Sequence, residues 1–202
     1  MSIKNIVFDF EQVFVRWEPF NVFKSYLKSK LEMEKLLEEI NHHRISTESD
    51  KGNGSFSALL RKTAEDFPHY KDMLLDYDVR WAETMNEVPG AVDLVLDLKK
   101  AGYKIYGLSN FSSDKIKDVY EKFDFHRHLD GAIVSAFVKV VKPNIEIYKL
   151  LCDKYHIKPE ETLFFDDRVE NVEGAKAAGM KGFVFISPQQ ARQALILAGI
   201  KI

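Results

Sequence analysis

Hydrophobic residues follow two alternating patterns in the second half of the chain. From Pro89 onward, short apolar runs typical of buried strands alternate with segments whose apolar residues recur every three or four positions, as in amphipathic helices. This alternation predicts an α/β fold, a Rossmann-like parallel sheet with helices on both faces. We expect strands over 104–108, 131–135, 162–165 and 182–185, and helices over 91–100, 113–123, 145–155, 172–178 and 189–198.

The first part of the chain consists of one strand followed by a long helical segment. A short apolar run near the N-terminus predicts a buried strand with Asp9 at its far end. Beyond this strand the apolar spacing is helical up to about Trp81, and strand signals are nearly absent. We therefore expect a sheet domain formed by residues 1–15 and 86–202, interrupted by a helical subdomain over residues 16–85.

Composition and charge narrow the classes of function. The chain has 202 residues, 46% of them hydrophobic, and a net charge of -2 without a long basic run, so we expect neither nucleic acid nor an anionic membrane as a partner. The single cysteine, Cys152, cannot form an internal disulfide and lies in a helical pattern that predicts a core position. Without an apolar stretch of about 20 residues or a signal-peptide pattern, the chain is expected to be cytoplasmic. The oligomeric state does not follow from the sequence.

Polar residues follow the predicted strands at the points where the strands end. Asp9 follows the first strand, Ser109 and Asn110 follow the strand over 104–108, and Lys142 comes after the strand over 131–135. Taken singly, each has an ordinary explanation, because Asp, Ser and Asn cap helices and turns and a lysine is usually solvated. In an open α/β sheet, however, ligands bind at the carboxyl ends of the strands.

The most informative strand end is the pair Asp166-Asp167, which follows an all-apolar run. Two adjacent acids repel each other, and a cation relieves the repulsion; carboxylate oxygens of this kind suit Mg²⁺. Capping of the following helix is the alternative explanation. Four predicted strands end at or shortly before such polar residues, namely Asp9, Ser109/Asn110, Lys142 and Asp166/Asp167. Because a parallel sheet would bring these strand ends to one edge, a shared site is a better explanation than coincidence.

Four motifs, in this order along the chain, carry a family resemblance. They are Phe-Asp-x-x-x-Val, Leu-Ser-Asn, Lys-Pro and Phe-Phe-Asp-Asp-x-x-x-Asn, with a helical segment after the first. The chain thereby resembles, over essentially its whole length, the haloacid dehalogenase-like (HAD) hydrolase superfamily. It is most similar to the cap-bearing subgroup that includes glucose-1-phosphate phosphatase and the N-terminal phosphatase domain of soluble epoxide hydrolase.

The resemblance implies a phosphatase that acts on a small phosphorylated metabolite, with a sugar phosphate as the inherited expectation. Asp9 would be the nucleophile and would form an aspartyl-phosphate that water then hydrolyses. Ser109 and the backbone N–H of Asn110 would bind phosphate oxygens. Lys142 would bridge Asp9 and the phosphoryl group.

The resemblance also implies Mg²⁺ as the cofactor. The ion would be bound by the Asp9 carboxylate, the main-chain carbonyl of Glu11 and the Asp167 carboxylate, with Asp166 and Asn171 acting directly or through water. Charge makes this plausible, because a phosphomonoester of about -2 would approach three carboxylates. Two like charges ~4 Å apart repel by about 4 kcal/mol at an effective dielectric of ~20. A cation and a lysine would offset that repulsion.

The chain departs from the family pattern at Glu11-Gln12. Related phosphatases usually have a second Asp two residues after the nucleophile as general acid/base, followed by Gly. We hypothesise that Glu11 takes this role, because a carboxyl near Asp9, Asp166 and Asp167 should have a raised pKa and so be able to protonate a leaving oxygen. The alternative is that its longer side chain lies out of line, and that activity is reduced or lost.

The helical segment would serve as a cap that closes over the site and selects the substrate. Candidate residues for this role are Arg16, Trp17 and the loop 51–54, although Arg16 is more typical of a surface residue and Trp17 of a packing anchor. The pair His42-His43 has no metal-binding spacing and is expected at the surface.

Three classes of function stay open at this level. A Mg²⁺-dependent phosphatase is the preferred interpretation. A metal-free 2-haloacid dehalogenase, in which Asp9 would attack carbon, is disfavoured by the Asp166-Asp167 pair. A protein that binds a phosphorylated ligand without turnover is the third, and the departure at Glu11-Gln12 motivates it.

Overall fold

A five-stranded parallel sheet forms the centre of the computed structural model, which describes residues 2–202. The strands are arranged in the order β5-β4-β1-β6-β7, so β1 is the central strand and pairs with β4 and β6. In register, Phe8 of β1 lies between Gly107 and Phe165, which aligns the carboxyl ends of these strands. The strands are β1 (Asn5–Phe8), β4 (Lys104–Ser109), β5 (Gly131–Val134), β6 (Thr162–Asp166) and β7 (Lys181–Val184).

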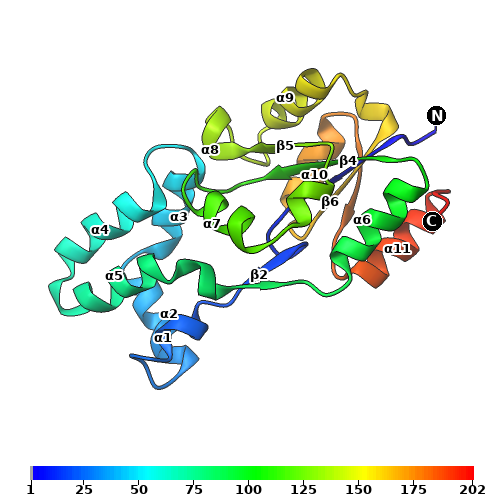
Figure 1. Cartoon of the computed structure of the whole chain (residues 1–202). Coiled ribbons are helices and arrows are strands. Elements are labelled where there is room, and N and C mark those ends of the chain that lie inside the picture. Colours follow the sequence, from blue (N-terminus) through cyan, green and yellow to red (C-terminus); the bar gives the residue numbers. More distant parts are fainter. Residues whose placement is uncertain (1) are drawn as a thin grey trace.

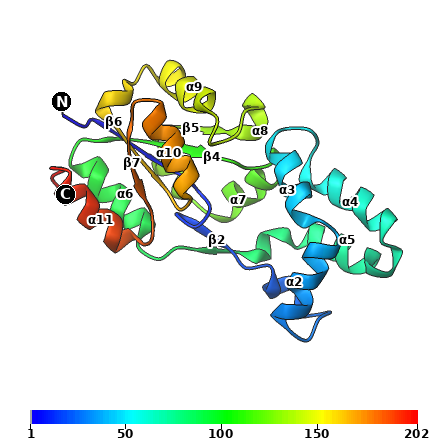
Figure 2. The same ribbon diagram turned by 180° about the vertical axis from the view of Figure 1, so that it is seen from behind.

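Helices cover both faces of the sheet, as Figures 1 and 2 show. Side chains alternate across a strand, so Ile6 and Phe8 of β1 pack on one face and Val7 on the other. The first face is covered by α6 (Ala91–Lys100), α7 (Lys115–Lys122) and α11 (Pro188–Leu197), and the second by α9 (Ile145–Tyr155) and α10 (Val169–Ala177). Short elements link them: α8 (Ser135–Val138) and the 3-10 helices η3 (Phe125–His128) and η4 (Pro159–Glu161).

Residues 18–84 form a separate group of helices, which we call the helical insert. Figure 1 shows this group beside one end of the sheet, away from the two chain termini. A two-stranded antiparallel ribbon, β2 (Val15–Trp17) with β3 (Met85–Glu87), lies where the chain leaves and re-enters the sheet domain. The insert contains α1 (Phe20–Phe23), α2 (Lys30–Glu39), α3 (His42–Asp50), α4 (Phe56–Asp66), η1 (Pro68–Tyr70), α5 (Lys71–Val79) and η2 (Trp81–Thr84).

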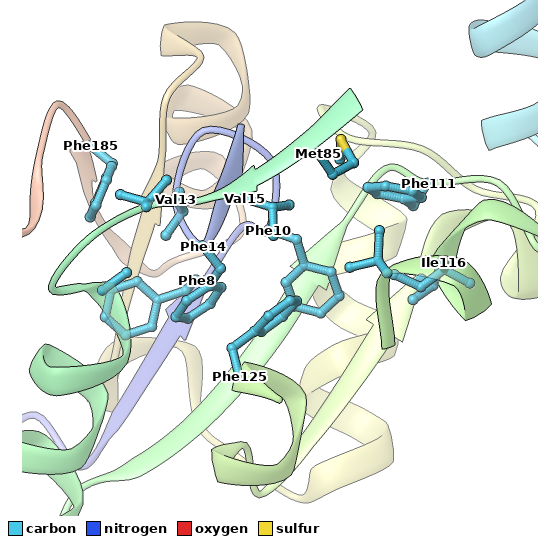
Figure 3. Close-up of a cluster of buried hydrophobic side chains, with 14 of the residues drawn as sticks. Phe8, Phe10, Val13, Phe14, Val15, Met85, Phe111, Ile116, Phe125 and Phe185 are labelled. Atoms are coloured by element: carbon cyan, nitrogen blue, oxygen red, sulfur yellow. The ribbon is translucent and has the colours of Figure 1, made fainter. Parts of the chain in front are cut away.

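A cluster of aromatic rings fixes the loop that follows β1 (Figure 3). Phe14 stacks on Phe125 with ring centroids 4.6 Å apart, and Phe10 meets the same ring edge-on at 5.1 Å. Gly107 is required for this packing, because a Cβ at that position would lie 2.3 Å from the Phe10 ring. Phe10 is thus held in the core, whereas its neighbours Asp9 and Glu11 line a cavity.

The predicted α/β fold is confirmed, and the expected strands and helices of the sheet domain are all present. The predicted core position of Cys152 is also confirmed, because its side chain is buried in α9. The sequence patterns missed α8 and the β2–β3 ribbon, whose strands of three residues are too short to show an alternation. Within residues 2–202, no helix combines the length and the apolar character needed to cross a bilayer.

Candidate active site

Asp9 lies directly after β1, at the carboxyl edge of the sheet, and is 6% exposed. Its main-chain N–H donates to the carbonyl of Phe165 at 2.9 Å, which holds the residue against β6. Its Oδ1 accepts a hydrogen bond from the Phe10 N–H at 2.7 Å and lies 2.9 Å from Nζ of Lys142. Burial raises the pKa of Asp9 to about 7, although the lysine opposes this shift. A bound cation would favour the ionised form.

Lys142 is buried and links two carboxylates. Its Nζ lies 2.9 Å from Oδ1 of Asp9 and 2.6 Å from Oδ2 of Asp166. Asn110 fixes the main chain of the lysine, because its amide oxygen accepts from the Lys142 N–H at 2.8 Å and its amide nitrogen donates to the Lys142 carbonyl at 3.1 Å. The Asn110 side chain therefore positions the lysine, which leaves its backbone as the group that could contact phosphate.

Asp166 and Asp167, at the end of β6, have different surroundings. Asp166 is fully buried, and its carboxylate accepts from Lys142 Nζ, from the Arg168 N–H at 2.9 Å and from the Asn171 side chain at 2.9 and 3.1 Å. Asp167 is half-buried and lines a cavity. Burial and the adjacent charge of Asp166 raise the pKa of Asp167. The hydrogen bonds of Asp166 leave Asp167 as the member of the pair with a carboxylate directed to the cavity.

The residues present fit a divalent cation. One carboxylate oxygen from each of Asp9, Asp166 and Asp167 lies within 4.8 Å of the others, a spacing at which three oxygens can share one ion. The donors are hard anionic oxygens, which suit Mg²⁺. Three carboxylates face a single ammonium group, that of Lys142, so the cluster has a deficit of positive charge that a divalent ion would balance.

Ser109, the last residue of β4, has a hydroxyl without a protein partner. Its Oγ is buried and has no partner at hydrogen-bond geometry within residues 2–202, although it lies near enough to the Asp9 carboxylate to oppose the rise in the pKa of Asp9. A buried hydroxyl without a partner is costly, and a ligand oxygen can remove that cost. The sequence-predicted contact of Ser109 with a phosphate oxygen remains a prediction, and the unpaired hydroxyl is consistent with it.

Glu11 and Gln12 both line the cavity. Glu11 is half-buried, and its pKa is raised to about 7, first by burial and then by the charges of Asp9, Asp50 and Asp167. Gln12 has a φ of +59°, in the left-handed region that favours glycine. Gln12 therefore adopts the backbone conformation for which a glycine would be expected.

A cavity of about 740 Å³ extends from Asp9 to the helical insert. Of the insert candidates taken from the sequence, Trp17 lines this cavity, whereas Arg16 and the loop 51–54 do not. Asp50, at the end of α3, also lines it and was missed. Its carbonyl accepts a hydrogen bond from the Ser135 hydroxyl at 2.6 Å, which ties the end of α3 to the sheet domain. The only available signal was its place directly before the loop 51–54.

The prediction that His42 lies at the surface is wrong. Its ring is buried, stacks on Trp17 with centroids 5.1 Å apart, and lies 3.2 Å from the Tyr77 hydroxyl through Nε2. Burial lowers the pKa of His42 to about 4, so the ring is uncharged at neutral pH. Neighbouring His43 is exposed, as expected. The polar sequence of α3 concealed which side of the helix faces inward.

Comparison with known proteins shows which family the chain belongs to. The family model of haloacid dehalogenase-like hydrolases matches residues 3–179. The chain is 26% identical over 163 residues to glyceraldehyde 3-phosphate phosphatase of Pyrococcus furiosus, covering 72% of this chain and 68% of that protein. It is 28% identical over 196 residues to D-ribitol-5-phosphate phosphatase of Bacteroides thetaiotaomicron, covering 90% and 91%.

A solved structure gives the same picture of the fold. A HAD family enzyme of Bacteroides thetaiotaomicron, in complex with magnesium and inorganic phosphate, superposes with a TM-score of 0.70 at 23% identity, covering 92% of this chain and 96% of that one. Since the family model spans most of the sequence, the chain belongs to the haloacid dehalogenase-like hydrolases. It is thus a hydrolase, as its motifs indicated.

Proposed function

We propose that the protein is a Mg²⁺-dependent phosphomonoesterase that acts on a small phosphorylated metabolite. The observation that carries this proposal is the convergence of Asp9, Asp166 and Asp167 around Lys142 at the end of the cavity. The phosphatases among the relatives support it, as does the magnesium and phosphate complex of the structural neighbour.

In this proposal Asp9 is the nucleophile. Its carboxylate oxygen attacks phosphorus, the bond from phosphorus to the leaving oxygen breaks, and an aspartyl-phosphate forms on Asp9. Lys142 keeps the carboxylate in place from 2.9 Å and attracts the phosphoryl oxygens. The Ser109 hydroxyl and the Asn110 N–H bind those oxygens as charge redistributes over them. Water then attacks phosphorus and releases inorganic phosphate and free Asp9.

Mg²⁺ would be held by the carboxylates of Asp9 and Asp167 and the main-chain carbonyl of Glu11. When bound, the ion offsets the repulsion between the carboxylates and a dianionic phosphate. Asp166 already accepts hydrogen bonds from Lys142, the Arg168 N–H and Asn171, so we assign it the role of orienting the site and Asp167 that of the main ligand of the pair.

Glu11 is the proposed proton donor to the leaving oxygen. It lines the cavity two residues after the nucleophile, and burial keeps its pKa near 7, so the carboxyl retains a proton close to neutral pH. After the leaving group departs, the same carboxylate can accept a proton from the attacking water. Replacement of Glu11 by Gln should lower turnover by about a hundredfold, and Glu11→Asp should keep part of it.

We further propose that the helical insert is a cap that closes the site. Its α3 contacts the sheet domain through the hydrogen bond from Ser135 to Asp50. Asp114, which precedes α7, accepts hydrogen bonds from the N–H groups of Phe56 and Ser57 at 3.0 and 2.9 Å, so the sheet domain caps helix α4 of the insert. These contacts keep the insert over the cavity, where it would exclude water.

Hydrolysis of para-nitrophenyl phosphate, measured with Mg²⁺ and with a chelator, tests the proposed function. We expect turnover that the chelator abolishes and that Asp9→Asn lowers by at least about a thousandfold. Asp93→Asn, at an exposed position of α6, is the matched control and should be unchanged. Metal-independent release of halide from 2-haloacids would instead support a dehalogenase. Tight phosphate binding without turnover would support a non-catalytic ligand-binding protein.

A further inference from the structure

The insert side of the cavity has an uneven distribution of charge. We define the insert wall as the cavity-lining residues between 37 and 81. Within the described chain this wall has two acidic residues, Glu38 and Asp50, and neither lysine nor arginine. His42, on the same wall, is kept uncharged by its burial. His43, the other histidine of the wall, is exposed to solvent.

The cations elsewhere around the cavity are already engaged. Lys142 contacts Asp9 and Asp166 at the phosphate end. Arg168, exposed at the rim, pairs with Glu170. A ligand that carried a second negative charge toward the insert would therefore meet the carboxylates of Glu38 and Asp50 without a counter-ion. Such like-charge juxtaposition is a means of rejecting the wrong ligand.

Hydroxyl groups and aromatic rings make up much of the remaining insert wall. Ser46 and Thr47 of α3 line the cavity with their short polar side chains. They share with Asp50 the spacing of three or four residues that places side chains on one face of a helix. Trp17 and Trp81 line the same cavity from the two strand-to-insert connections. Carboxylate and hydroxyl groups accept hydrogen bonds, and the rings offer flat apolar surfaces.

We propose that the substrate's leaving group is small, rich in hydroxyl or other hydrogen-bond donors, and free of negative charge, and that Asp50 excludes phosphomonoesters with a second anionic group. This proposal rests on the proposed phosphatase function and narrows its substrate class. It assigns Asp50 a role in specificity, separate from the chemistry at Asp9. Phosphorylated polyols and neutral sugars fit this class, whereas phosphorylated carboxylic acids and bisphosphates do not.

A matched pair of substrates tests this proposal. Glycerol 3-phosphate and 3-phosphoglycerate have the same three-carbon chain but differ at one end, where a hydroxymethyl group replaces a carboxylate. Assays at about pH 8 keep Asp50 ionised, since its pKa is raised to about 7 by burial. We expect kcat/KM for glycerol 3-phosphate to exceed that for 3-phosphoglycerate by on the order of tenfold or more.

The variant Asp50→Asn removes the charge at nearly constant size. It should narrow the preference at least about threefold, because kcat/KM for 3-phosphoglycerate rises relative to that for glycerol 3-phosphate. The ratio of the two values cancels any change in turnover that both substrates share, including one at Glu11, whose pKa the Asp50 charge also raises. Glu34→Gln is the matched control, because Glu34 is an exposed acid on α2 outside the cavity lining, and it should leave the preference unchanged. Equal use of the two substrates by the wild type would overturn the proposal, as would an Asp50→Asn variant with an unaltered preference.

A binding measurement separates failure of this proposal from failure of the proposed function. The chain has two tryptophans, Trp17 and Trp81, and both line the cavity, so their fluorescence should report ligand binding. In Asp9→Asn, titration with the two compounds should show tighter binding of glycerol 3-phosphate even where no turnover occurs. Discrimination in binding without turnover in the wild type would refute the phosphatase while upholding the selectivity. Turnover without discrimination between the two compounds would support the phosphatase and refute the selectivity.

Discussion

The carboxylates on the two walls of the cavity differ in whether they are paired with a cation. On the wall formed by the sheet domain, Asp9 and Asp166 both contact Lys142, and Asp166 receives further hydrogen bonds from Asn171. On the insert wall, Glu38 and Asp50 form no ion pair with any of the residues 2–202. The first arrangement holds its carboxylates in fixed positions, as the proposed reaction step requires. The second leaves the charges of Glu38 and Asp50 available to a ligand, as expected of a surface that selects between substrates.

Loss of Lys142 should have the largest effect. In Lys142→Met two buried carboxylates lose their common cation, and removal of one partner from a buried ion pair destabilises by about 3–5 kcal/mol. Turnover of para-nitrophenyl phosphate should also fall by about 10²–10³-fold, because in the proposed mechanism Lys142 attracts the phosphoryl oxygens. Urea unfolding and kcat measure the two effects.

The control for this variant is Lys149→Met, at an exposed position of α9. It should leave both the free energy of unfolding and turnover close to those of the wild type. If Lys142→Met behaved in the same way, the sheet-domain wall would not be the tightly paired cluster described above.

The pH dependence of stability should distinguish the two walls next. Burial raises the pKa of Asp9 and Glu11 on the sheet-domain wall, and that of Asp50 on the insert wall, to about 7, well above the value of about 4 for an unfolded chain. The folded state therefore binds more protons than the unfolded state between these values. The stabilisation is fully present below about pH 4 and is lost as the pH rises through 7, with a slope of at most about 1.4 kcal/mol per pH unit for each group.

Addition of Mg²⁺ should reduce the part of this slope that comes from Asp9 and Glu11, because a cation favours the ionised carboxylates, and should leave the part that comes from Asp50. Asp50→Asn should remove the other share with or without the metal. Free energies of unfolding in urea at several pH values between 5 and 8, with Mg²⁺ and with a chelator, measure both. Equal slopes in the wild type and Asp50→Asn would show that Asp50 gains no charge in this range.

The same contrast explains what could be predicted from the sequence. Ser109 and Asp166 end a strand, and Asp9, Asn110 and Asp167 come directly after one. Parallel pairing aligns the strand ends, so their positions at the carboxyl ends of strands indicated that they lie at one edge of the sheet. The fold followed for the same reason, since strand and helix periods differ clearly from Pro89 onward.

The insert wall could not be predicted in this way. Helix α3 (His42–Asp50) has Ile45 as its one aliphatic residue, so no apolar stripe indicates which side is buried. The buried side is set by contacts with distant residues, namely those of His42 with Trp17 and Tyr77. Asp50 acquires its position in the cavity from this packing, and from the Ser135 hydrogen bond, rather than from any local pattern.

Replacement of Gln12 by glycine should have the smallest effect on stability and turnover. It tests whether Gln12 on the sheet-domain wall matters for its backbone conformation or for its side chain. Gln12 has a φ of +59°, which costs a residue with a side chain more than it costs glycine. Part of the gain is offset because glycine also makes the unfolded chain more flexible, so Gln12→Gly should stabilise by roughly 0.5–1 kcal/mol. Turnover should change by less than about threefold if Glu11, rather than Gln12, takes part in the chemistry.

His156→Gly is the matched control for this variant, because His156 has a φ of +54° at the C-terminal end of α9, where glycine is favoured. It should give a similar gain in the free energy of unfolding and leave turnover unchanged. A rise in turnover of tenfold or more in Gln12→Gly alone would mean that the Gln12 side chain obstructs the cavity. The Gln12 side chain would then slow turnover directly, in addition to occupying a backbone conformation that favours glycine.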